Sequence, residues 1–129
     1  MGNDQFELWH EMCEVMKWHN RPRHCCVDTI NRLLAKHPVT KGQRKTIRVT
    51  RESLVISAET RSIEQLWQLI HRKHLTRKPP GTTEVAVVVL RFGGNEYLLD
   101  GRRRINHWMR RNVAGPHRVL VLHARDMFY

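Results

Sequence analysis

Residues 97–108 read Tyr-Leu-Leu-Asp-Gly-Arg-Arg-Arg-Ile-Asn-His-Trp, a pattern that predicts a strand, a tight turn and the start of a helix. The turn is Asp100-Gly101, and Arg102, Arg103 and Arg104 fill the first turn of the helix. A helix N-terminus carries about half a positive charge and several N–H groups without partners, so each cation there costs about 0.3–1 kcal/mol. Three consecutive arginines therefore indicate that an anion binds at this point.

The same stretch predicts which residues contact the anion. Gly101 has no Cβ, so a phosphate can approach its backbone closely. The residues of this predicted phosphate or nucleotide site are Gly101, Arg102, Arg103 and Arg104. In the alternative interpretation, the helix start is solvated and its arginines pair with Asp100, Glu96 or Glu84.

The elements on both sides of this stretch follow the order of a small α+β domain. Apolar residues recur every three or four positions in the predicted helices, and the predicted strands alternate or are continuously apolar. Helices are predicted at 5–18, 27–37, 62–75 (with Ser62 as N-cap) and 102–112, and strands at 46–50, 85–92, 96–99 and 118–124. We expect a mixed sheet with flanking helices at residues 45–129, preceded by a two-helix N-terminal extension at residues 1–44.

The charge of the chain is high and unevenly distributed. Its 129 residues include 23 Lys and Arg against 12 Asp and Glu, a net charge of +11. Residues 1–20 hold four acids against one lysine, a net charge of −3, so the remainder carries +14. A remainder this basic favours a nucleotide or nucleic-acid partner, whereas the acidic helix could contact the chain's own basic part or a partner protein.

Basic residues outside the arginine motif widen the predicted nucleic-acid surface. These residues are Lys41, Arg44, Lys45, Arg72, Lys73, Arg77, Lys78, Arg110 and Arg111. In the alternative interpretation, these long cationic side chains only solvate an outward face.

The remaining composition restricts the class of protein. The longest apolar run, residues 85–90, is far shorter than the roughly 20 residues of a membrane span, so we predict no membrane association. Three cysteines, Cys13, Cys25 and Cys26, without an N-terminal signal pattern predict free thiols in a reducing cytoplasm. The histidines and cysteines of residues 10–26 match no common zinc spacing, so no metal site is predicted.

The order of elements around Asp100-Gly101-Arg102-Arg103-Arg104, namely strand, turn, helix and closing strand, resembles the ParB and sulfiredoxin superfamily. The motif of this superfamily places paired basic residues within three positions of a glycine. The resemblance covers about residues 45–125, with residues 47–51 as the opening strand. It implies a small mixed sheet and a nucleoside triphosphate over Gly101, Arg103 and Arg104. Arg102 stands where ParB proteins carry an acidic residue and sulfiredoxins a catalytic cysteine, so this chain lacks the sulfiredoxin nucleophile.

Two functional hypotheses follow. In the first, the protein binds a nucleotide, DNA or RNA at the arginine motif; any activity would be that of a nuclease or phosphodiesterase, or NTP-dependent phosphoryl transfer, assisted by Mg²⁺. The candidate catalytic acids are then Asp100, Glu52, Glu59 and Glu64. In the second, the same fold serves as a small non-enzymatic interaction or regulatory module, for example of a mobile element, which docks a protein through its acidic N-terminal helix.

Overall fold

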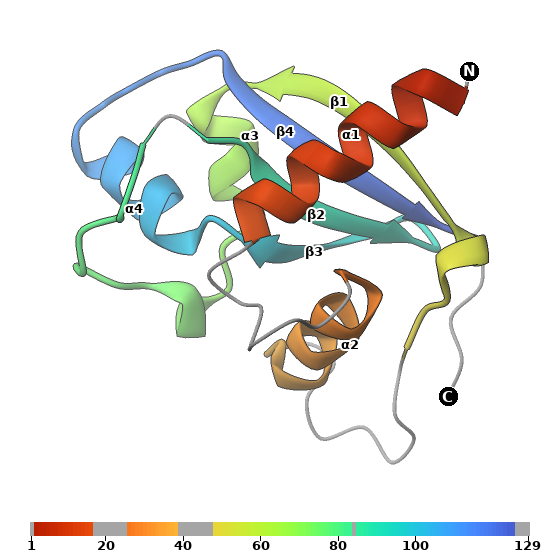
Figure 1. Cartoon of the computed structure of the whole chain (residues 1–129). Helices are drawn as coiled ribbons and strands as arrows, with labels where there is room; N and C mark the ends of the chain where they lie inside the picture. The colour runs from red at the N-terminus through yellow and green to blue at the C-terminus, as the bar shows by residue number, and fades with distance from the viewer. Residues whose placement is uncertain (1, 17–25, 39–47, 84, 126–129) are drawn as a thin grey trace.

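The computed structural model describes residues 2–16, 26–38, 48–83 and 85–125 (Figure 1). Its helices and strands are α1 (Gly2–Val15), α2 (Cys26–Lys36), β1 (Leu54–Arg61), α3 (Ile63–Trp67), β2 (Val87–Phe92), β3 (Asn95–Asp100), α4 (Arg102–Arg110) and β4 (His117–Ala124). Two short 3₁₀ turns are η2 (Arg51–Ser53) and η3 (Arg72–His74). The predicted α+β fold is confirmed. None of the described helices combines the length and apolar character that crossing a membrane requires.

The four strands form one mixed sheet in the order β1-β4-β2-β3. Strand β4 runs antiparallel to β1 and parallel to β2, and β2 and β3 form an antiparallel hairpin. The interior strand β2 is buried on both faces because successive side chains alternate. Val88 and Leu90 pack in the cluster that includes α1 and α2, whereas Val87 and Val89 pack in the cluster that includes α3 and α4.

The N-terminal helices pack on the sheet, and α1 lies across one of its faces (Figure 1). The Gln5 side chain acts toward the edge strand β1 as a neighbouring strand would: its Nε2 donates to the carbonyl of Ile56 (2.7 Å), and its Oε1 accepts from the Ile56 amide (3.0 Å). Glu11 forms an ion pair with Arg118 of β4 at 2.8 Å. The acidic helix α1 thus contacts the chain's own basic part.

The predicted strand at residues 46–50 is wrong where the structure describes it. Residues 46 and 47 lie outside the described residues, Arg48 forms only an isolated bridge, and Val49 and Thr50 are not in a strand. The Asn31 side chain of α2 occupies both backbone groups of Val49, at 3.0 Å and 2.7 Å. Because a side chain takes these groups, the first strand begins only after η2, at Leu54.

The helix predicted at residues 62–75 is much shorter in the structure. Ser62 caps it as predicted, accepting from the Gln65 amide, but α3 ends at Trp67. A turn at residues 68–69 follows, and the backbone is extended at His71 before η3 begins. The following loop is held instead by side chains of α4. The Asn106 Nδ2 donates to the carbonyl of His74 (3.0 Å), so tertiary contacts override the local helical pattern.

The prediction of free thiols is wrong for Cys13, which is disulfide-bonded. An odd number of cysteines still permits one disulfide. The cysteine content therefore no longer supports placing the protein in a reducing compartment.

Candidate anion site at the start of helix α4

Gly101 forms the turn between β3 and α4 in a conformation that favours glycine. Its φ is 115°, and as N-cap of α4 it offers no side chain to the first-turn amides. A Cβ here would lie 2.8 Å from Cγ2 of Val87 and 3.2 Å from Nη2 of Arg104. The fold alone thus requires glycine at this position, and it leaves the helix N-terminus without a side-chain cap.

The three motif arginines have different environments. Arg104 is only 8% exposed, and its Nη2 donates to the carbonyl of Ala86 and to Oδ2 of Asp100, both at 2.9 Å. Its Nε is buried and has no hydrogen-bond partner among the described residues. For Arg104, the alternative of an ion pair with Asp100 therefore holds. Arg102 and Arg103 are exposed and form no ion pair with an acid of the described residues.

A cavity of about 670 Å³ opens at this turn. Its walls come from the end of α2, the loop that contains η3, the end of β3 and the start of α4. It is lined by Leu33, Lys36, His37, Pro38, Lys73, His74, Pro80, Gly81, Thr82, Leu98, Leu99, Asp100, Gly101, Arg102, Arg103 and Arg104. This volume falls in the range of small-molecule sites, roughly 300–1,000 Å³. All four residues of the predicted phosphate site are thus brought to one cavity.

Two side chains of α4 form hydrogen bonds to the loop around η3, which lines one wall of the cavity. Asn106 is buried, and besides its bond to His74 it accepts from the Thr76 amide at 3.4 Å. Nη1 of Arg110 donates to the carbonyl of Thr76 at 2.8 Å. Sequence reasoning missed this role of Asn106 because these partners lie some 30 residues away in the chain.

Histidines from separate elements line the same cavity. The rings of His37, after α2, and His74, in η3, meet edge to face with centroids 5.1 Å apart, and His37 contacts Tyr97 in the same manner at 5.4 Å. Burial, reinforced by His74 and His71, lowers the pKa of His37 to about 4. Burial, followed by Arg102 and His71, also lowers the pKa of His74. Both imidazoles are therefore neutral at pH 7. No sequence motif marked this pair.

The basic residues predicted as a nucleic-acid surface do not all gather at the cavity. Lys73 lines it, whereas Arg72, Arg77 and Lys78 are exposed on the same loop without lining it. Arg110 fastens the loop, and Arg111 is exposed at the other end of α4. The remaining three, Lys41, Arg44 and Lys45, lie outside the described residues.

The four candidate catalytic acids are not brought together. Asp100 lines the cavity but is paired with Arg104. Glu52 and Glu64 are exposed and do not line the cavity. Glu59 lies on the sheet, with its Oε2 2.8 Å from Nε of Arg61.

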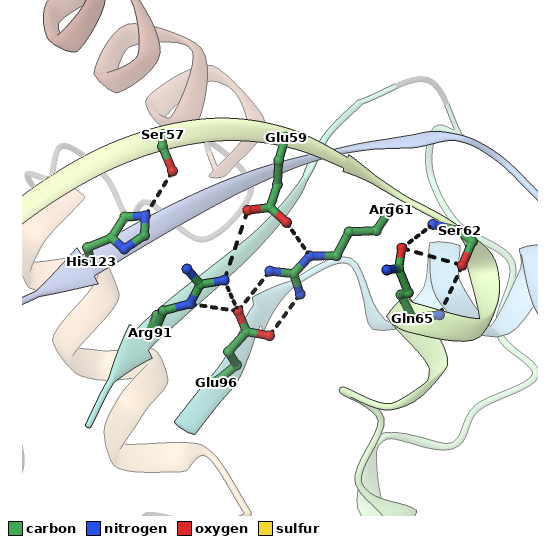
Figure 2. A network of polar contacts seen from close by, with 8 residues as sticks. All are labelled: Ser57, Glu59, Arg61, Ser62, Gln65, Arg91, Glu96 and His123. Atoms are coloured by element: carbon green, nitrogen blue, oxygen red, sulfur yellow. Dashed lines mark hydrogen bonds and ion pairs between the residues drawn. The ribbon is translucent and has the colours of Figure 1, made fainter. Parts of the chain in front are cut away.

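Glu59 belongs to a network on the sheet that is balanced in charge (Figure 2). Arg61 donates through both terminal nitrogens to Glu96, at 2.8 Å and 2.7 Å, and Nη2 of Arg91 lies 2.8 Å from the same carboxylate. The hydrogen bond from Arg61 is the main cause of the lowered pKa of Glu96. Two acids and two arginines compensate one another here, so the network leaves no excess positive charge for an anion.

Comparison with protein-family models, with curated proteins and with solved structures found no match to this chain. The resemblance to the ParB and sulfiredoxin superfamily therefore stays a prediction. The case for an anion site depends on the cavity, its charges and the start of α4.

Proposed function

We propose that this protein binds a phosphate-bearing ligand of nucleotide size in the cavity at the start of α4. The observation that carries the proposal is the position of Arg102 and Arg103: both are exposed on a helix N-terminus without a side-chain cap, and both line a cavity of about 670 Å³. First-turn amides, the helix dipole and two guanidinium groups all favour an anion at such a place.

The charge of the cavity supports the same ligand. Four cationic residues line it without an ion pair to any described acid: Lys36, Lys73, Arg102 and Arg103. The one carboxylate among the described lining residues, Asp100, is paired with Arg104. A phosphate group would compensate cations that the described part of the fold leaves uncompensated. The concave shape and the leucine and proline lining favour a small ligand over a duplex, whose phosphates a protein contacts along an open surface.

The proposal is limited to binding. Phosphoryl transfer uses positioned carboxylates and Mg²⁺ together with cations, and Asp100, the only carboxylate among the described residues that line the cavity, forms an ion pair with Arg104. A nucleoside triphosphate, the ligand that the ParB resemblance implies, is the ligand class we propose.

A thermal-shift screen tests the proposal. Nucleoside triphosphates, with and without Mg²⁺, and short single- and double-stranded DNA and RNA are added to the purified chain. A ligand that binds only the folded state adds about 2.7 kcal/mol of stability at a hundred times its Kd, so a saturable rise in Tm is expected with at least one nucleotide. A rise with nucleic acid alone would assign the site to that ligand. No rise with either would overturn the proposal and favour the interaction module.

A further inference from the structure

His37 and His74 form one wall of the cavity, and their neutral imidazoles can accept a proton, which the arginines cannot. These two imidazoles come from the end of α2 and from η3, and both are more than nine-tenths buried. Their rings contact each other at 5.1 Å while lining the same cavity as Arg102 and Arg103. The cavity that holds the two exposed arginines is thus also lined by two neutral bases.

The surroundings keep this pair uncharged while the cavity holds no anion. Among the described residues, the titratable and charged groups around the pair are Lys36 of α2, His71, Arg72 and Lys73 of the η3 region, Tyr97 and Asp100 of β3, and Arg102, Arg103 and Arg104 of α4. Asp100 is the only acid among them, and Arg104 already compensates it. Burial and the nearby cations therefore both disfavour an imidazolium.

A bound anion reverses this electrostatic balance, since a nearby negative charge favours the protonated form of a base. We propose that His37 and His74 act as a proton-accepting wall of the site, so that binding of the phosphate group draws a proton from bulk solvent onto this pair. One N–H bond forms, a neutral imidazole becomes an imidazolium, and nothing is oxidised or reduced. This inference depends on the proposed function, because the anion must first occupy the cavity.

The hydrogen bonds of His74 indicate where its proton lies. The backbone N–H of His71 donates to Nδ1 of His74 at 3.2 Å, which assigns the proton of the neutral ring to Nε2. His74 thus keeps an N–H donor even when neutral. If His74 becomes the cation, its Nδ1 must be protonated and the hydrogen bond from the His71 N–H is lost. Otherwise His37 takes up the proton.

Proton uptake and affinity are reciprocal by linkage. If the anion raises the pKa of the pair, its affinity must rise as the pH falls from the pKa of the bound state toward that of the free state. The affinity changes roughly tenfold for each unit by which the pKa is raised. The N-terminal extension, through His37, would thereby set the pH dependence of a site whose arginines lie on α4.

The experiment uses sulfate as the probe, because this dianion has no proton to release between pH 4 and 8. The pKa of each histidine is measured by NMR on the wild-type chain from its Cε1–H resonance, in sodium sulfate and in sodium chloride of equal ionic strength. We expect sulfate to shift the amide resonances of Arg102 and Arg103 and to raise the pKa of His37 or His74 by about one unit, roughly tenfold in the protonation constant. Exposed His10 on α1 serves as the internal control and should not change.

Matched variants distinguish anion binding at the start of α4 from proton uptake by the histidines. Arg103→Gln should abolish both the sulfate-induced amide shifts and the pKa change, whereas Arg111→Gln at the other end of α4 should preserve both. If sulfate shifts the amide resonances of Arg102 and Arg103 but leaves the pKa values of both His37 and His74 unchanged, the proposed proton uptake is wrong and the anion site still stands. An absence of sulfate shifts at the start of α4 would overturn the proposed function and this inference with it.

Discussion

Nη2 of Arg104 lies 2.9 Å from Oδ2 of Asp100, four residues earlier at the end of β3, and the two side chains are only 10% and 13% exposed. This pair divides three consecutive arginines into two kinds. Arg104 ties the start of α4 to β3 and, through the carbonyl of Ala86, to the residue before β2. Arg102 and Arg103 stay exposed at the cavity, so a ligand can use their charges without disturbing the fold.

Replacing Arg104 should destabilise the fold strongly. Arg104→Met removes the guanidinium that forms an ion pair with the carboxylate of Asp100, and breaking a buried ion pair from one side typically costs about 3–5 kcal/mol. Arg102→Met removes an exposed side chain and should change the free energy of unfolding by less than about 0.5 kcal/mol. Urea denaturation of both variants checks this, and equal midpoints would contradict the division of roles.

Gly101 should tolerate no side chain, even in the absence of any ligand. Gly101→Ala places a Cβ 2.8 Å from Cγ2 of Val87 at a φ of 115° and should cost on the order of 1–3 kcal/mol. Gly81→Ala is the matched control in the same cavity lining, because no atom lies within 4 Å of its added Cβ. Thermal unfolding of the two variants gives the comparison; a Gly101→Ala protein as stable as the control would show that the turn can relax.

Gln5 should protect the edge of the sheet. Gln5→Ala removes both hydrogen bonds to Ile56, and a net loss of about 1–2 kcal/mol is expected. Amide hydrogen exchange at Ile56 provides the specific readout and should become faster, because its N–H then faces solvent on an edge strand. Exposed Gln68 gives a control substitution that should leave this amide unaffected. Unchanged exchange in Gln5→Ala would mean that other atoms cover the edge.

Stability should fall as the solution becomes acidic. The pKa of His37 is lowered to about 4 in the folded chain from about 6.5 when unfolded, so between these values the unfolded chain binds more protons. The free energy of unfolding should therefore decrease from pH 6.5 to pH 4, on the order of 3 kcal/mol from this residue, and level off below. Urea denaturation across this range tests it: His37→Gln should flatten the slope, and an identical slope in that variant would refute the assignment.

Elements with strong local signals could be predicted from the sequence. Helix α2, the hairpin β2–β3, helix α4 and strand β4 begin and end within a few residues of the predicted positions, because periodicity, the Gly93-Gly94 turn and the Gly115-Pro116 break define them locally. Strand β1 could not be placed, since one of its faces is largely polar, with Ser57, Glu59 and Arg61. Its position is determined by pairing with β4, from Leu54 opposite Ala124 to Arg61 opposite His117.

The candidate site was predictable only in part. The arginine motif was found because three cations at a helix start contradict the helix dipole. The burial of Arg104 was missed, since helical spacing alone does not reveal the carbonyl of Ala86 that receives its guanidinium. The walls from α2 and η3 were missed because His37 and His74 reach the cavity only through tertiary packing.

The most direct test of the anion site is a titration of the chain with inorganic pyrophosphate, followed by backbone amide NMR at constant ionic strength. The largest shifts are expected at the amides of Arg102 and Arg103. Arg103→Glu should weaken binding at least tenfold, whereas Arg111→Glu, the same charge reversal at the other end of α4, should weaken it less than about threefold. Equal weakening by the two variants, or shifts spread over the exposed basic residues away from the cavity, would contradict a defined site at the start of α4.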